Sequence, residues 1–159
     1  MQLSSTTLQK IDQLILHYPV KRSCVLPILH LIQEEKGFIS KDAMQWIAQK
    51  LDLQPMQIYE VVTFYPMFKE EPLGRTHIKV CRTLSCALKG SHQTCEAFQK
   101  SLNCEIGHTT PEGEFTLEFV ECLADCANAP VVQINERMHA CCTSEKALEL
   151  CKQLKEPLS

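Results

Sequence analysis

The sequence is short of three features: long apolar runs, basic residues near its start, and glycine. No window approaches the ~18 uninterrupted apolar residues that a membrane-spanning helix needs. The first twenty positions hold a single Lys or Arg, Lys10, and lack the charged-then-apolar order of a signal peptide. The chain is therefore expected in the cytoplasm, without direct membrane insertion. Its 5 glycines form no glycine-rich loop that would cradle a nucleotide phosphate.

Positive charge is scarce along the whole chain as well. The 16 Lys and Arg are outnumbered by 19 Asp and Glu, which gives a formal net charge of −3. A protein that binds phosphate backbones needs the opposite balance, so nucleic acid is not an expected partner. Paired carboxylates beside a histidine are also missing. The chain therefore has no complete active site of its own, and a partner must supply any electrons.

Cysteine, by contrast, is abundant, with 10 in 159 residues. In a secreted protein this number would suggest five disulfides. Here the cysteines are clustered and no export signal precedes them, which favours thiols kept for a metal or for redox chemistry. A disulfide framework remains the alternative.

Two patterns of hydrophobic spacing predict an α+β protein, with an N-terminal helical bundle followed by a thioredoxin-like mixed sheet with flanking helices. Helical spacing comes first, over 4–17, 24–36, 41–51 and from Pro55 to Pro66. Charged residues, Pro and Gly then gather at 69–74, which places a boundary between domains 1–73 and 74–159. Strands and helices mix beyond it, with strands at 77–80, 115–120, 131–134 and 137–140 and helices at 91–102 and 143–154.

Two cysteine pairs stand where predicted strands end. Cys81 and Cys86 are separated by four residues, and Cys122 and Cys126 by three. A [2Fe–2S] cluster takes two thiolates per iron, and such spacings let one loop supply both. Its irons, sulfides and thiolates sum to about −2, and to about −3 after one-electron reduction. Donors are therefore expected nearby, from N–H groups beyond Cys86 and Cys126 and from cations at 79, 82 and 89.

Two other sites compete with the cluster at these thiols. A structural zinc, in a module that serves assembly alone, is usually held by pairs with two intervening residues. A dithiol–disulfide oxidoreductase uses the same short spacing at a helix N-terminus. Neither pair here has that spacing, so the [2Fe–2S] interpretation is favoured over both.

Several other residues are expected to be structural. Cys95 and Cys151 lie at apolar helical positions and are typical of small core residues. The adjacent Cys141 and Cys142 are expected to be unpaired, since a bond between neighbours is strained. His30 is expected in the core rather than on a metal. Core packing is likewise favoured over a docking surface for the aromatic residues at 64, 65 and 68.

The chain resembles a known family, the 24 kDa-type, thioredoxin-like [2Fe–2S] subunit (the E-type subunit) of NADH:quinone oxidoreductase, respiratory complex I. Similar stretches cover nearly the whole chain. They are 26–29, 37–40, 64–68, 80–81 with 85–86, 109–116, and 121–123 through 126–131, and include both cysteine pairs.

The resemblance implies that Cys81, Cys86, Cys122 and Cys126 ligate the cluster. It also implies that the chain is a subunit of an oxidoreductase, docked on the flavin- and NADH-binding subunit of the peripheral arm. FMN and NADH would then bind that partner, and the chain would lie at the inner face of the plasma membrane through the complex. Related subunits serve NAD(P)-linked hydrogenases and formate dehydrogenases, and these remain alternatives.

One departure from the family lies inside the second pair. The family commonly has Gly after the Leu that follows Cys122, whereas this chain has Ala124 and then Asp125. If position 124 needs a positive φ, alanine costs on the order of 1 kcal/mol. The carboxylate of Asp125 is expected to lower the potential of an anionic cluster beside it.

Overall fold

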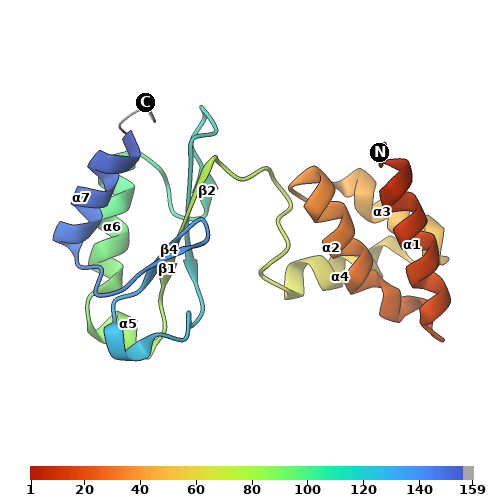
Figure 1. Cartoon of the computed structure of the whole chain (residues 1–159), viewed down its shortest axis with the longest axis horizontal. Helices are drawn as coiled ribbons and strands as arrows, with labels where there is room; N and C mark the ends of the chain where they lie inside the picture. The colour runs from red at the N-terminus through yellow and green to blue at the C-terminus, as the bar shows by residue number, and fades with distance from the viewer. Residues whose placement is uncertain (156–159) are drawn as a thin grey trace. The chain divides into compact units, whose positions relative to one another are not determined.

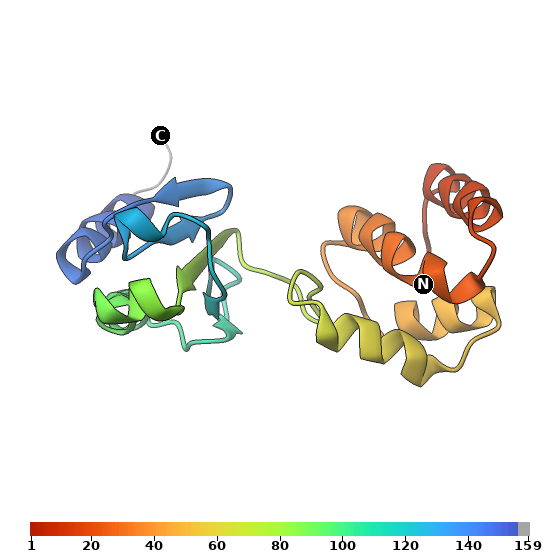
Figure 2. The same cartoon turned by 90° about the horizontal axis from the view of Figure 1, so that it is seen from below.

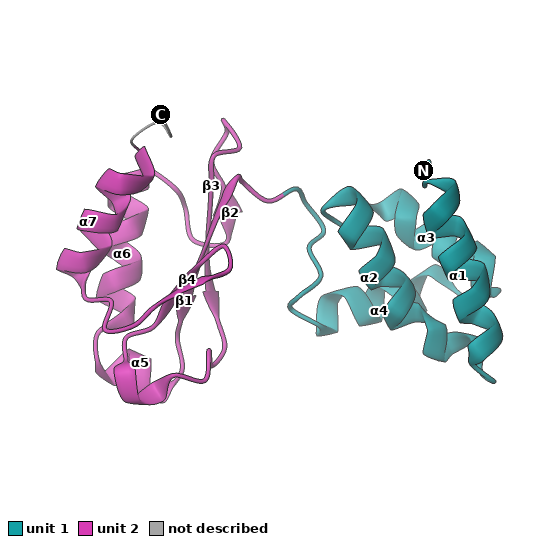
Figure 3. Cartoon of the chain, viewed as in Figure 1, with its two compact units in different colours: residues 1–72 teal, residues 73–159 magenta. Residues whose placement is uncertain are grey.

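The computed structural model describes residues 1–155, and its contacts divide the chain into two units, Met1–Pro72 and Leu73–Ser159 (Figure 3). The first unit is helical and the second is built on a sheet (Figure 1). This is the α+β architecture expected from the sequence. In the described part of the chain, no helix has the length and apolar character needed to cross a bilayer.

The first unit consists of four α-helices and one short 3-10 turn. The elements are α1 (Ser5–His17), η1 (Lys21–Cys24), α2 (Val25–Lys36), α3 (Lys41–Leu51) and α4 (Pro55–Phe64). Ser4 and Ser40 cap α1 and α3, because each hydroxyl accepts the N–H three residues on. Gly37 ends α2 at φ 82°, a conformation that glycine adopts without strain. Caps and apolar spacing thus predict these helices to within one or two residues.

The core of the first unit is aliphatic. Ile11 of α1, Ile28 of α2, Ile47 of α3 and Ile58 of α4 are fully buried together. The side chain of Gln33 holds the segment after α4, because it donates to Met67 O and accepts from Lys69 N. That segment is therefore part of the unit and not a free linker.

The three aromatic residues near this segment do not share one environment. Phe68 is buried in the core as expected, and its ring lies 5.0 Å from that of His30, which is half-buried against it. Tyr65 is half-buried. Phe64, in contrast, is 77% exposed, so the prediction of core packing is wrong for this residue.

The second unit is a five-stranded sheet in the order β2-β3-β1-β4-β5. Its strands are β1 (Thr76–Cys81), β2 (His108–Thr109), β3 (Phe115–Val120), β4 (Val132–Ile134) and β5 (Arg137–His139). β1 and β3 are parallel, and the remaining pairs are antiparallel. The sequence predicts four of these strands, and the two-residue β2 is missed because it is too short to show a period.

Two helices, α6 (Ser91–Leu102) and α7 (Ser144–Lys155), pack together on one side of the sheet (Figures 1 and 2). Their buried residues meet those of the strands in one core, where Phe98 contacts the layer that holds Ile78 and Leu117. Cys95 and Cys151 lie in this core, as expected for small apolar residues. The helices thereby fix the sheet whose edge carries the two cysteine pairs.

Candidate metal centre

The parallel pairing of β1 and β3 brings the two cysteine pairs to one end of the sheet. Cys81 is the last residue of β1 and is in register with Val120, the last residue of β3. Because parallel strands point the same way, the segments that follow them leave from the same edge. Cys122 begins its loop two residues after Val120. One strand pairing therefore brings together two motifs that are far apart along the chain.

An ion pair joins the segments that leave these two strands. The guanidinium of Arg82 donates from Nε and Nη2 to Oε1 of Glu121, at 3.0 and 2.7 Å. Arg82 follows Cys81 and Glu121 precedes Cys122, so the pair links the two loops beside the thiols. Arg82 was expected to offset the charge of the site, but the carboxylate of Glu121 balances its charge.

The first pair is buried. Cys81 and Cys86 are each 1% exposed and pack with Val131 and the partly buried Leu123. The sequence favours a loop between them, but residues Leu84–Leu88 form the short helix α5, which contains Cys86. A single turn is too short for hydrophobic spacing to reveal it. The N–H groups after Cys86 consequently donate to carbonyl oxygens within the turn. The prediction that these groups donate to sulfur is therefore wrong.

The second pair is exposed and its sulfurs are close. The Sγ atoms of Cys122 and Cys126 lie 3.5 Å apart. The N–H of Ala124 donates to Cys122 Sγ at 3.3 Å, from a backbone with φ 65°. This donor comes from inside the second pair, whereas a backbone hydrogen bond from Val131, which lies beyond Cys126 as expected, lowers the pKa of Cys86 against the larger effect of burial. The short 3-10 turn η2 (Cys126–Asn128) follows.

The two thiols of each pair differ in pKa, because their surroundings lower the pKa of one and raise the pKa of the other. Burial raises the pKa of Cys81, but hydrogen bonds from Thr83 and from the Leu123 N–H outweigh it and lower the value. Burial raises the pKa of Cys86 to about 11. The Ala124 N–H lowers the pKa of Cys122, and the neighbouring Cys122 raises the pKa of Cys126. Metal binding has to displace the protons that each pair retains.

The donor set fits a two-iron cluster better than a single ion. A structural zinc is usually held by pairs with two intervening residues, whereas the pairs here have four and three. Two pairs of thiols, one buried and one exposed, suit a cluster that takes two sulfur ligands at each iron.

The remaining cysteines take no part in this site. Every cysteine of the described chain is a free thiol. Burial raises the pKa of Cys95 to about 12 and the pKa of Cys142 to about 11, which keeps both protonated and unreactive. Cys141 is exposed and unpaired beside the buried Cys142, as expected for this adjacent pair.

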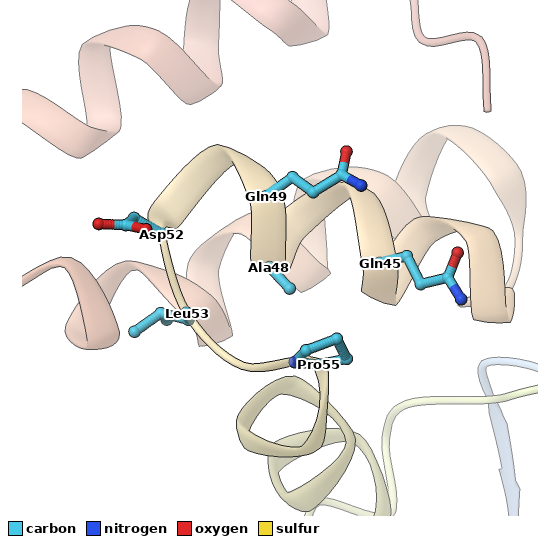
Figure 4. A pocket seen from close by; sticks show the side chains of 6 residues that line it. All are labelled: Gln45, Ala48, Gln49, Asp52, Leu53 and Pro55. Carbon is cyan, nitrogen blue, oxygen red and sulfur yellow. The ribbon is translucent and has the colours of Figure 1, made fainter.

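A pocket in the first unit lies apart from the cysteines along the chain, between α3 and the start of α4 (Figure 4). It is lined by Gln45, Ala48, Gln49, Asp52, Leu53 and Pro55. This lining offers one carboxylate, from Asp52, and no thiol or imidazole. Soft metals such as iron in a sulfide cluster prefer sulfur ligands, so the cysteine pairs are the better candidate site.

Sequence reasoning missed one side chain at the site. Thr83 lies between Cys81 and Cys86 in the chain, and its Oγ1 is 3.3 Å from Cys81 Sγ. The available signal was its position, because a hydroxyl two residues after a thiol at a strand end is within reach of that thiol. The donors expected from sequence were cations and backbone N–H groups, and a hydroxyl was not among them.

The fold and the paired thiols together define a small thioredoxin-like iron–sulfur protein. Residues 11–155 match the family model of the thioredoxin-like [2Fe-2S] ferredoxins, and the chain belongs to this family. Membership gives a [2Fe–2S] cluster as the cofactor, in agreement with the expectation from the spacing of the cysteines.

Relatives agree with this assignment over most of their length. The chain is 40% identical over 142 residues to the E subunit of NADH-quinone oxidoreductase of Rickettsia felis, covering 87% of this chain and 85% of the relative. It is 37% identical over 134 residues to the E 2 subunit of NADH-quinone oxidoreductase of Rhizobium meliloti, covering 84% of this chain and 80% of the relative. The resemblance identified from sequence motifs is thereby confirmed.

A solved structure shares the fold. An NAD+-reducing [NiFe]-hydrogenase in the air-oxidized state superposes with a TM-score of 0.67 at 19% identity. The match covers 85% of this chain but 23% of the hydrogenase chain. At this identity the likeness concerns the fold alone.

Proposed function

We propose that Cys81, Cys86, Cys122 and Cys126 ligate one [2Fe–2S] cluster in an electron-transfer subunit of an NADH:quinone oxidoreductase, complex I. The cluster supplies one-electron redox chemistry. The chain's own part is to hold four thiolates at one sheet edge and to shield two of them. The single observation that carries the proposal is the meeting of both pairs where β1 and β3 end.

The NADH-quinone oxidoreductase relatives favour complex I as the parent assembly. In this assignment the chain exchanges electrons with the flavin of the NADH-binding partner subunit, because its own sequence has no phosphate-cradling glycine loop. It lies at the cytoplasmic face of the membrane through the peripheral arm of that complex. A hydrogenase or formate dehydrogenase subunit is the alternative, and the fold likeness to the hydrogenase does not favour it over complex I.

The surface beside the thiols suits an electron-transfer contact. Cys122 and Cys126 are exposed, and α5 presents Leu84 and Leu88, which are 75% and 79% exposed. Leucines four residues apart lie on one face of a helix. This apolar face next to the second pair is where we place the flavin-binding subunit, because an apolar contact excludes water from the path of the electron.

The test is assembly of the full-length chain, loaded with its cluster, with the flavin- and NADH-binding partner of the same complex. Wild-type chain is expected to copurify with that flavoprotein, and NADH is expected to reduce the cluster only in the mixture. The double variant Leu84→Glu/Leu88→Glu should lower the amount of copurified flavoprotein and the rate of cluster reduction by NADH, each at least tenfold. Leu148→Glu is the matched control, since Leu148 is exposed on α7, which contributes nothing to the site. Reduction by NADH without the flavoprotein, or equal loss in the control, would contradict the proposal.

A further inference from the structure

Thr83 lies at a position where its hydroxyl would ordinarily accept a hydrogen bond from a backbone N–H. It is the N-cap residue of α5, and threonine at this position commonly accepts a hydrogen bond from an N–H of the first turn. Here the side chain makes no capping bond. Its Oγ1 lies instead 3.3 Å from Cys81 Sγ. The hydroxyl is therefore directed to sulfur and not to the helix that it precedes.

The side chain of Thr83 also influences the second pair electrostatically. The Ala124 N–H lowers the pKa of Cys122 most, and the Thr83 side chain lowers it as well. Thr83 is half-buried, between the buried Cys81 and the exposed Cys122. The direct hydroxyl–sulfur contact of Thr83 is the one to Cys81.

Ligation decides the direction of the hydrogen bond between Thr83 and Cys81. Between a thiol and a hydroxyl, either group can donate. A cysteine bound to iron is a thiolate and has no proton, so the contact survives only if the threonine O–H donates. Hydrogen bonds to cluster sulfurs stabilise the extra negative charge that reduction brings, and raise the reduction potential.

Resting on the ligand assignment proposed above, we propose that Thr83 is a positioning residue of the redox centre, whose hydroxyl donates to Cys81 and raises the cluster's midpoint potential. The hydroxyl, and not the bulk of the side chain, carries this role. A residue that only shaped the turn would act through its backbone conformation and its methyl group.

The test compares Thr83→Val, which keeps the shape and removes the hydroxyl, with Thr83→Ser, which keeps the hydroxyl and removes the methyl. Thr63→Val is the control, since the Thr63 hydroxyl bonds to Tyr59 O on α4, in the other unit. The midpoint potential of the cluster in the full-length chain is measured by redox titration followed by electron paramagnetic resonance. Thr83→Val should shift it downward, while Thr83→Ser and Thr63→Val should remain at the wild-type value.

An unchanged midpoint in Thr83→Val, or an equal downward shift in Thr83→Ser, would overturn the proposal. If Thr83→Val does not retain a cluster, Thr83→Ala replaces it. If Thr83→Ser retains the cluster while Thr83→Val and Thr83→Ala both lose it, the result supports the role of the hydroxyl. If Thr83→Ser loses the cluster as well, the result refutes that role. A wild-type chain that binds no cluster would overturn the ligand assignment and this inference together. A normal cluster with a potential indifferent to Thr83 would overturn this inference alone.

Discussion

Ala124 donates its N–H to Cys122 Sγ at 3.3 Å from a left-handed backbone with φ 65°. Position 124 therefore does need a positive φ, the condition under which the sequence predicts a cost for alanine. An L residue other than Asn or Asp rarely adopts this conformation without strain. The hydrogen bond to sulfur depends on that conformation. The second pair therefore holds a strained residue at the point where its cysteine receives a donor.

Replacing Ala124 with glycine should stabilise the protein. The left-handed conformation costs alanine roughly 1–2 kcal/mol, which glycine avoids. The greater freedom of glycine in the unfolded chain offsets about half of this, so the net gain in stability is about 1 kcal/mol or less. Urea unfolding of the cluster-free chain measures the difference. Ala127→Gly in the same loop, where φ is not positive, is the control and should destabilise. A loss of stability in Ala124→Gly would show that φ at 124 is not strained.

The sequence predicted the helices with caps and regular apolar spacing, because each such signal is local. It also predicted the four cysteines as ligands, since their spacing is a local property, and this assignment stays a prediction. It did not predict α5 or the donors from Leu123 and Ala124. These depend on the backbone of loops and on the parallel pairing of β1 with β3, and no local pattern encodes either. The exposure of Phe64 was missed for a different reason, because its aromatic character was weighed above its position off the face of α4 that carries the buried Ile58 and Val62.

Asp125→Asn should raise the midpoint potential of the cluster. The carboxylate places negative charge beside Cys126, and its removal favours the reduced, more negative state. The substitution preserves the local hydrogen bond, since Oδ1 of residue 125 accepts from Asn128 Nδ2 at 2.8 Å and an amide oxygen can do the same. Glu136→Gln, in the turn between β4 and β5, should leave the potential unchanged. An unchanged or lower midpoint in Asp125→Asn would contradict the electrostatic argument.

Glu35 should make the stability of the protein sensitive to acid. Hydrogen bonds from Thr7, and also from Ser4, lower the pKa of Glu35 from its ordinary 4.5 to about 2. A carboxyl whose pKa is lower when folded contributes its full stability above the unfolded value. That contribution is lost as the pH falls from about 4.5 towards 2.

The free energy of unfolding of Glu35→Gln should accordingly be lower than that of the wild type at pH 7, and the two should converge near pH 2. Chemical unfolding across this range measures both curves. Glu34→Gln, at a neighbouring position, is the control and should follow the wild type. A constant difference between wild type and Glu35→Gln at every pH would show that the carboxylate's charge is not the cause.

The segments 1–73 and 74–159 should behave as separate domains, with the cluster in the second. Both hydrophobic cores of the second unit, including the one around Cys81 and Cys86, are built from its own residues. The fragment 74–159 should therefore bind the cluster at the same iron and sulfide content as the full chain, which chemical analysis measures. A fragment that folds, by circular dichroism, but binds no cluster would contradict this division.

The most direct test of the central claim is the iron and acid-labile sulfide content of single Cys→Ser variants, each measured after reconstitution. The wild type should contain about two irons and two sulfides per chain and be red-brown. Serine at 81, 86, 122 or 126 should reduce or abolish this content, whereas serine at the exposed, free Cys141 should not. Full cluster content in any of the four variants, or a colourless wild-type protein that holds zinc, would contradict the assignment.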